Sequence, residues 1–326
     1  MRAVLCKQWG PPESLVVENL PDLSAGPDEV VVSVKACGVA FPDVLTIQGK
    51  YQIKPAFPFS PGNEIAGIVS SVGSNITAFK PGDAVLGRGK TGGCAEEVIA
   101  TPENLWPLPA GVDFTVAAGF GMNYATSYHA LRDRGQLKAG ETLMVLGASG
   151  GVGLAAVELG KMMGARVIAC ASTEEKLETC RRFGADEVIN YETGNLRDAV
   201  KQLTGDKGVD VIYDPVGDRF ADPAVRCMAW GGRYLVVGFA AGAIPKIPLN
   251  LALLKGCSIV GVWWGGLTKA DPKRANAVFA ELLAMVASGK IKPYISATYP
   301  LERTGDALKD LMTRKVQGKI VVVTGR

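Results

Sequence analysis

The sequence has few of the histidine and cysteine residues that bind zinc ions. It contains one histidine, His129, and seven cysteines, none of which belongs to a C-x-x-C pair. An odd and dispersed set of cysteines favours reduced thiols over a framework of disulfide bonds. Zinc ions are usually held by clustered cysteine and histidine side chains. We therefore expect neither disulfides nor a zinc site of ordinary nitrogen and sulfur ligands.

The sequence also lacks long apolar runs, internal repeats and a strong excess of one charge. No stretch approaches the roughly 20 apolar residues of a membrane-spanning helix. Residues 1–6 are typical of a first strand rather than of a secretion signal. The formal net charge of +3 offers no electrostatic basis for binding nucleic acid or an anionic membrane. We expect a cytoplasmic protein with neither kind of partner.

The most informative stretch is residues 142–153, with the sequence TLMVLGASGGVG. Its first five residues form a short apolar run typical of a buried parallel strand, and residues 152–163 repeat apolar side chains at helical spacing. Strand, glycine turn and helix in this order predict the phosphate-binding corner of a dinucleotide fold, although an ordinary α/β loop is the alternative. Gly150 would let the backbone approach a pyrophosphate, and Gly153 would let the helix pack on the strand. The candidate cofactor contacts here are Ser149, Gly150, Gly151, Val152 and Gly153.

The chain changes its pattern near residue 123. Before it, short strands alternate with Gly- and Pro-rich turns, which suggests an antiparallel, partly closed β-barrel. After it, strands alternate with helices, which predicts a doubly wound parallel sheet. The expected strands are 30–34, 65–72, 84–86 and 95–99, then 142–146, 166–171, 187–190, 209–213, 234–237 and 258–262, with helices at 152–163, 174–183 and 195–203.

The last part of the chain is too short for a domain of its own. It contains an amphipathic helix at 272–288 and short strands at 294–299 and 319–323. We expect it to return to the barrel, which makes the fold an α/β fold with an inserted nucleotide domain. The predicted domains are 1–122 with 264–326, and 123–263.

Several motifs together suggest a family. They are GVAFPD at 38–43, GKY at 49–51, PGNEIAG at 61–67, TSYHAL at 126–131 and the glycine turn. With the order barrel, inserted dinucleotide domain, return, they resemble the medium-chain dehydrogenase/reductase superfamily. Within it, the whole chain resembles the zinc-independent quinone oxidoreductase branch, the relatives of zeta-crystallin. The resemblance implies a GroES-like catalytic domain and a Rossmann domain.

The positions at which this sequence differs from the zinc-dependent members of that superfamily indicate which substrates it can reduce. Those enzymes have a Cys at the position of Ala40, a His at that of Asn63 and a third ligand near Met122, and their four-Cys lobe is represented only by Cys94. Without a Lewis acid, an alkoxide is not stabilised, so the substrate must itself accept hydride readily. Quinones and α,β-unsaturated carbonyl compounds meet this requirement.

The resemblance also implies the cofactor. Ala171 stands where NAD-specific enzymes end the second strand with an acidic residue that bonds the ribose 2′-OH. Ser172, Thr173 and Lys176 match positions that hold the 2′-phosphate in NADP-using members, so we expect NADPH. Alternatively, Thr173 caps a helix and Lys176 is a solvated lysine. The neighbouring pair 174–175, both glutamate, counts against a phosphate site.

Four further positions near the cofactor follow from the resemblance. Tyr191 matches an aromatic residue near the adenine, or is a half-exposed tyrosine at a strand end. Gly238 and Phe239 lie on the loop that passes the nicotinamide, and residues 214–217 form a neighbouring loop that lines the site with backbone. Thr126 matches a position near the carboxamide, or serves as a helix N-cap.

In the barrel, Tyr51 matches a tyrosine that lines the substrate cleft and is our candidate catalytic residue, as a hydrogen-bond donor to the reduced oxygen; a surface-loop tyrosine is the alternative. Ala40 replaces an Asn common in this branch. Trp263 and its neighbour Trp264 form either a substrate wall or a subunit contact. We interpret His129 as a packed or surface histidine, because no nucleophile accompanies it.

These observations predict an NADPH-dependent, zinc-independent reductase of quinones or enones. One alternative is a reductase of enoyl thioesters or 2-alkenals, for which Lys50, Lys54 and Lys269 are candidate basic contacts. Another is a structural protein that binds NADPH without turnover. We expect a homodimer that pairs the strand 258–262 across two sheets.

Overall fold

The computed structural model describes residues 1–89 and 91–325. They form two compact units, Met1–Met122 with Met285–Arg326 and Asn123–Ala284. These units put the segment 264–284 with the second part of the chain, whereas the sequence analysis placed its return to the first domain at residue 264. The domain limits themselves stay a prediction. Within residues 1–89 and 91–325, no helix combines the length and the apolar character needed to cross a membrane.

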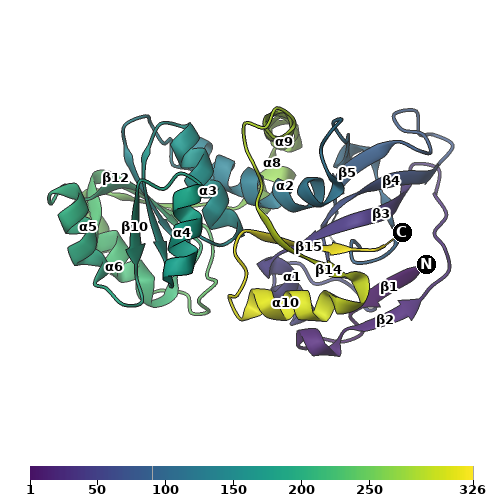
Figure 1. The fold of residues 1–326 in the computed structure, drawn as a ribbon, viewed down its shortest axis with the longest axis horizontal. Helices are drawn as coiled ribbons and strands as arrows, with labels where there is room; N and C mark the ends of the chain where they lie inside the picture. The colour runs from purple at the N-terminus through teal and green to yellow at the C-terminus, as the bar shows by residue number, and fades with distance from the viewer. Residues whose placement is uncertain (90, 326) are drawn as a thin grey trace. The chain divides into compact units, whose positions relative to one another are not determined.

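The first unit is built on a seven-stranded sheet in the order β14-β15-β3-β4-β5-β7, with β6 paired to β3. Figure 1 shows the C-terminal β15 beside β3, which it pairs in antiparallel register. The strands are β3 (Val30–Val39), β4 (Glu64–Val72), β5 (Ala84–Arg88), β6 (Glu97–Ala100), β7 (Leu105–Pro107), β14 (Ile295–Pro300) and β15 (Lys319–Val323), and a separate ribbon joins β1 (Arg2–Leu5) to β2 (Val16–Asn19). The described pairing runs as an open path from β14 to β7, so it contains no closed barrel.

β3 begins with three successive valines, without the alternation of apolar and polar residues that a half-exposed strand shows. It pairs with β4, β6 and β15, and Val30, Val31 and Val32 are all fully buried. A strand covered on both faces loses the usual alternation of apolar and polar residues. The helices of this unit are α1 (Phe41–Ile47) and α10 (Thr304–Met312), and α2 (Phe114–Tyr128) contains the boundary between the units.

The second unit is a six-stranded sheet in the order β10-β9-β8-β11-β12-β13, with every pair parallel. This is the strand order of a Rossmann fold: β9 and β10 are added on one side of β8, and β11, β12 and β13 follow on its other side. α3 packs against β8 and β9, and α4 against β9 and β10 (Figure 1). The strands are β8 (Thr142–Leu146), β9 (Arg166–Ala171), β10 (Glu187–Asn190), β11 (Val209–Asp214), β12 (Met228–Val236) and β13 (Ser258–Gly261). The helices are α3 (Gly151–Met162), α4 (Glu174–Arg182), α5 (Leu196–Thr204), α6 (Ala221–Arg226), α7 (Asn250–Lys255), α8 (Trp264–Ala270) and α9 (Pro272–Ala287).

The structure confirms the predicted α/β fold and most predicted elements to within two residues. The exceptions are β3, which ends at Val39 rather than at residue 34, and β12, which begins at Met228 rather than at residue 234. Trp230 is 81% exposed and Gly231 has φ +74°, so this stretch carries no apolar pattern that would indicate a strand. The short helices α6 and α7 were also not predicted, because six residues are too few to show a helical period.

Candidate functional site

The glycine turn after β8 has the backbone geometry of a phosphate-binding corner. Gly147 turns the chain with φ +58°, and its carbonyl accepts a hydrogen bond from Gly150 N at 3.0 Å. A Cβ on Gly153 would lie 2.3 Å from Gly147 O, so only glycine allows the first turn of α3 to pack this closely. The chain therefore turns at Gly147, one residue before the first glycine position of the usual G-x-G-x-x-G motif. Ala148, which occupies that first position, is buried.

The side of the turn at Gly150 is open. A Cβ on Gly150 would meet only Gly147 O, at an ordinary 3.4 Å. The first N–H groups of a helix have no acceptor within the helix, and the helix dipole favours an anion there. Behind the turn, Ser127 Oγ donates to Val152 O at 2.8 Å and lies 2.9 Å from the Tyr213 hydroxyl. The open backbone at Gly150 and the first N–H groups of α3 thus suit a pyrophosphate.

The side chain of Asn123 lies against this corner, and sequence reasoning missed it. A Cβ on Gly151 would lie 2.6 Å from Asn123 Nδ2, so a larger residue there would displace the Asn123 side chain. Asn123 is buried in α2, well before the turn in the sequence. No local pattern points to such a residue, because only the folded unit brings it to the turn.

The carboxyl end of β9 brings two of the predicted phosphate contacts together. Lys176 Nζ donates to Ser172 Oγ at 3.3 Å, and Ala171 is buried at the strand end. Thr173 is the N-cap of α4, and its Oγ1 accepts a hydrogen bond from Lys176 N at 3.4 Å. Thr173 therefore caps the helix, as one interpretation of this segment holds. The 2′-phosphate contacts of Ser172, Thr173 and Lys176 stay a prediction.

Glu174, the first residue of the acidic pair beside this site, is exposed and paired with an arginine of its own helix. Glu174 Oε1 accepts a hydrogen bond from Arg181 at 2.6 Å, and its side chain is 70% exposed. Arg181 also binds Glu178, at 3.0 Å. The Glu174 charge is therefore compensated along α4, which removes part of the argument against an anion at Ser172.

Tyr191 lies at the same edge of the sheet. Its N–H donates to Ala171 O at 3.2 Å, and its ring packs on Phe220 with the two ring centroids 4.4 Å apart. Thr126 lies in the last turn of α2, so its interpretation as an N-cap is wrong. The TSYHAL motif continues a helix that began at Phe114, and a cap residue belongs at the start of a helix.

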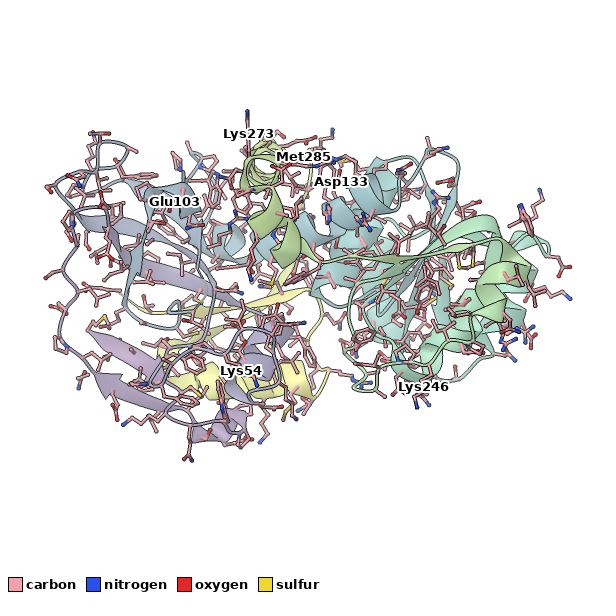
Figure 2. All side chains as sticks on the ribbon, turned by 180° about the vertical axis from the view of Figure 1, so that it is seen from behind. Lys54, Glu103, Asp133, Lys246, Lys273 and Met285 are labelled. Atoms are coloured by element: carbon pink, nitrogen blue, oxygen red, sulfur yellow. The ribbon has the colours of Figure 1, made fainter. Side chains whose placement is uncertain are left out.

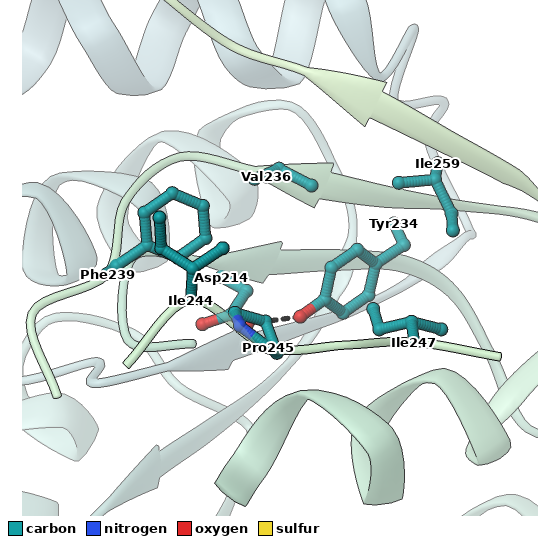
Figure 3. A pocket seen from close by; sticks show the side chains of 8 residues that line it. All are labelled: Asp214, Tyr234, Val236, Phe239, Ile244, Pro245, Ile247 and Ile259. Atoms are coloured by element: carbon teal, nitrogen blue, oxygen red, sulfur yellow. Dashed lines mark hydrogen bonds between the residues drawn. The ribbon is translucent and has the colours of Figure 1, made fainter. Parts of the chain in front are cut away.

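A cavity of about 210 Å³ lies next to the loops that follow β11 and β12 (Figure 3). Its polar end is Asp214, whose Oδ1 accepts hydrogen bonds from Val216 N at 2.7 Å and Gly217 N at 2.9 Å. Tyr234 donates its hydroxyl to the other carboxylate oxygen, and burial raises the pKa of Asp214. Phe239 lines the cavity with Asp214, Tyr234, Val236, Ile244, Pro245, Ile247 and Ile259. The loop predicted to contribute backbone is therefore held by its own aspartate side chain.

In the first unit, a buried carboxylate interacts with two of the residues expected to contact the substrate, Ala40 and Tyr51. Asp43 Oδ2 accepts a hydrogen bond from Ala40 N at 2.8 Å, and its Oδ1 accepts one from Gly62 N at 3.1 Å. Burial raises the pKa of Asp43 to about 6. Burial and the nearby charge of Asp43 together raise the pKa of the Tyr51 phenol. Tyr51 therefore stays protonated, as a hydrogen-bond donor must.

A second buried carboxylate, Glu64 at the start of β4, joins three segments. Lys319 Nζ lies 2.5 Å from one of its oxygens, and Met122 N donates to the other at 2.5 Å. The Lys319 and Glu64 side chains are only 4% and 6% exposed. Sequence reasoning missed Asp43, Glu64 and Lys319. The signal for Lys319 is a charged residue that opens the apolar strand KIVVV.

The remaining candidates lie in the second unit. Trp263 is 55% exposed, with Lys269 Nζ 5.7 Å from the centroid of its ring. His129 is buried in the π-helical turn η3 (His129–Arg134), 2.8 Å from a carboxylate oxygen of Asp133, a residue labelled in Figure 2. The Trp264 ring lies against that histidine, with ring centroids 6.1 Å apart. His129 is thus a packed histidine.

The described residues contain no group of three or more His, Cys, Asp or Glu side chains arranged to hold a metal ion. Ala40, Asn63 and Met122 offer no set of ligands that zinc prefers, since only the thioether of Met122 and the amide of Asn63 carry donor atoms.

Comparisons with known proteins agree with this architecture. Residues 26–110 match the alcohol dehydrogenase GroES-like domain, and residues 151–287 match the zinc-binding dehydrogenase family. A GroES-like domain joined to a Rossmann-type sheet defines the medium-chain dehydrogenase/reductase class.

Relatives that match nearly the whole chain identify the family within this class. The chain is 42% identical over 327 residues to the quinone oxidoreductase-like protein 2 homolog of Nematostella vectensis, covering 99% of this chain and 89% of that protein. It is 35% identical to the human quinone oxidoreductase, covering 96% of this chain and 94% of that protein. The crystal structure of Escherichia coli quinone oxidoreductase complexed with NADPH matches with a TM-score of 0.92 at 29% identity, covering 99% and 100%. The chain belongs to the quinone oxidoreductase family of this superfamily.

Proposed function

We propose that this chain is an NADPH-dependent reductase of quinones or similar activated carbonyl compounds, acting without zinc. The observation that carries the proposal is the contact between Lys176 and Ser172 beside Ala171, at the place where an NAD-specific site has an acidic residue. An ammonium and a hydroxyl at this position favour a 2′-phosphate, and no carboxylate on the strand end repels it. The Escherichia coli relative complexed with NADPH supports the same cofactor.

The second unit supplies the proposed cofactor site. The amides of Gly151, Val152 and Gly153, with Ser149 and Gly150, would hold the pyrophosphate, and Ser172, Thr173 and Lys176 the 2′-phosphate. Tyr191 would face the adenine, and Thr126, Gly238 and Phe239 the nicotinamide end. When bound, NADPH supplies a hydride, and with one proton from solvent a quinone becomes a hydroquinone and NADPH becomes NADP⁺.

The proposed substrate residues are Ala40, Tyr51 and Trp263. The Tyr51 phenol would donate a hydrogen bond to the reacting oxygen, and this bond strengthens as negative charge develops there. Burial and Asp43 both raise its pKa, so the phenol remains a donor at neutral pH. Since these residues offer a hydrogen bond rather than a Lewis acid, the substrate must be an activated electrophile.

We also propose a homodimer formed through β13. This strand pairs only with β12 among the described strands, so one of its edges offers unpaired backbone groups. Ile244 and Ile259, which line the cavity of Figure 3, are 72% and 40% exposed, and Leu253 on α7 is 78% exposed. Light scattering on the purified protein should give twice the monomer mass, and Ile259→Lys should give the monomer. A monomeric unmodified protein would contradict this proposal.

The function is tested by kinetics with purified protein on a panel of quinones, 2-alkenals and enoyl thioesters, using NADPH and NADH. Quinone turnover that prefers NADPH supports the proposal. Turnover confined to enoyl thioesters or 2-alkenals would replace the substrate class. Tight NADPH binding without any turnover would instead favour a structural role for the protein.

A further inference from the structure

The cavity of Figure 3 lies within the second unit, and of its lining residues only Phe239 belongs to the proposed cofactor site. Its volume is about 210 Å³. A cavity of about 150 Å³ with apolar walls already binds benzene, so this one has room for a substituted benzene ring. Sites for small molecules combine apolar walls with a few polar groups, and this cavity has both.

The cavity has an exposed apolar mouth and a buried polar end. Ile244 and Ile259 line it and are 72% and 40% exposed, so a small molecule can reach it from solvent. Asp214 and Tyr234, which form its polar end, are only 2% and 1% exposed. Figure 3 shows the hydrogen bond between these two groups beside the side chain of Pro245. A ligand that enters past the isoleucines therefore meets the carboxylate at its inner end.

The Asp214 carboxylate is an acceptor that the chain does not use fully. Its Oδ1 accepts hydrogen bonds from Val216 N at 2.7 Å and Gly217 N at 2.9 Å, and its Oδ2 accepts one from the Tyr234 hydroxyl. Within residues 1–89 and 91–325 these are its three donors, whereas an ionised carboxylate has about four acceptor positions. The open position is on Oδ2, and the three existing bonds hold the carboxylate in place.

We propose that this cavity is a binding site for small phenols, with the ring among the apolar side chains and the hydroxyl donating to Asp214 Oδ2. A phenol brings one donor, which matches the one open acceptor position. An ammonium group would bring three donors, and the apolar walls would leave two of them unpaired at a cost. A hydrocarbon would shield the carboxylate from water without pairing it. This site is additional to the proposed function and needs neither the cofactor nor the substrate.

The direct test compares p-cresol with p-xylene, which have nearly the same shape and differ by a hydroxyl in place of a methyl. Titration calorimetry on the unmodified protein without cofactor should show one p-cresol per chain, bound about tenfold or more tightly than p-xylene, the effect of one hydrogen bond to a buried charged acceptor. A cavity that is only apolar would give the reverse order, because p-xylene is the more hydrophobic compound. Binding of p-xylene that is as tight or tighter, or no binding of either compound, would overturn the proposal.

Asp214→Asn tests the acceptor itself. The asparagine Oδ1 can still accept from Val216 N and Gly217 N, but its Nδ2 puts a donor where the open acceptor was. The preference for p-cresol should disappear while p-xylene still binds; an unchanged preference would overturn the proposal. The matched control is Asp186→Asn, because Asp186 accepts a backbone hydrogen bond from Val167 N at 2.7 Å but does not line the cavity. This control should keep the preference.

If Asp214→Asn does not fold, Ile247→Phe takes its place. The larger side chain occupies part of the cavity, so both compounds should bind about tenfold or more weakly. Unchanged affinities would show that the compounds bind elsewhere and would overturn the proposal.

A titration of p-cresol in saturating NADPH tests whether the cavity is separate from the cofactor site. p-Cresol should still bind, because Asp214 and the side chains of β12 and β13 that line the cavity are not among the proposed cofactor residues. Loss of p-cresol binding would place the cavity inside the cofactor site and overturn the proposal of a separate one. None of these measurements uses quinone turnover, so a failure of the proposed function would leave them unaffected.

Discussion

Replacing Lys176 with alanine tests the phosphate site at the carboxyl end of β9. Its Nζ lies 3.3 Å from Ser172 Oγ, so an anion bound by both groups would take the full effect of the ammonium charge. Two unit charges about 4 Å apart attract by about 1 kcal/mol in bulk water and about 4 kcal/mol at an effective dielectric of about 20. Lys176 is partly exposed, which favours the lower part of this range.

We therefore expect Lys176→Ala to weaken NADPH binding by about 1–2 kcal/mol, or about 5- to 30-fold. NADH binding should not change, because NADH has no 2′-phosphate. Fluorescence titration of both cofactors at low and high salt measures this difference, which should shrink as salt screens the charge.

Lys161→Ala is the matched control, since Lys161 lies on α3 and pairs with Asp186 at 2.7 Å. It should change neither affinity. Equal weakening of NADPH and NADH by Lys176→Ala, or no weakening of either, would refute the reasoning built on Ser172 and Lys176.

Three further changes test the structural basis of the two units. Gly153→Ala places a methyl 2.3 Å from Gly147 O and should destabilise the protein by about 1–3 kcal/mol in urea unfolding, with loss of NADPH binding. Lys319→Met leaves Glu64 as an uncompensated buried charge and should cost about 3–5 kcal/mol, most of which Glu64→Gln in the same chain should restore. The folded pKa of Asp43 is about 6, against 3.8 for an ordinary Asp, so the folded state holds this proton more tightly. Its contribution should lower stability by about 2–3 kcal/mol as pH rises from about 4 to 6, and Asp43→Asn should remove that slope.

For each of these three predictions, a specific result would contradict the structural reason given for it. Unchanged stability of Gly153→Ala would mean that the turn relaxes around the added methyl. If the Lys319→Met protein is as stable as the unmodified one, the pair of Lys319 and Glu64 does not stabilise the fold. A pH profile of Asp43→Asn parallel to that of the unmodified protein would show that Asp43 does not titrate in this window.

The Rossmann sheet could be predicted from sequence because its signals are local. The runs 166–171 and 187–190 coincide with β9 and β10. β9 is apolar and buried after its first residue, as a strand covered on both faces should be, and Gly184 marks the turn before β10. The glycine turn was likewise predicted from its residues, and Gly153 packs as expected. β12 began earlier than predicted because its first residues include Trp230, which is exposed, and two glycines.

The polar residues of the first unit could not be predicted in the same way. Lys319 is separated from Glu64 by 255 residues, and no pattern in a single sequence pairs two such distant charges. Asp43 lies within a recognised motif, but its role depends on two backbone N–H groups, one of them nineteen residues away. Asn63 was noted only as a replacement for a zinc ligand, since the lack of a partner for its Oδ1 is visible only in the folded structure.

The most direct test of the central claim is NADPH oxidation by the purified, chelator-treated protein with a quinone as the acceptor, followed by the absorbance of the reduced nicotinamide and repeated with NADH. We expect quinone turnover that is faster with NADPH and unchanged by the chelator. Turnover that prefers NADH, or that is lost with the chelator and restored by zinc, would contradict it.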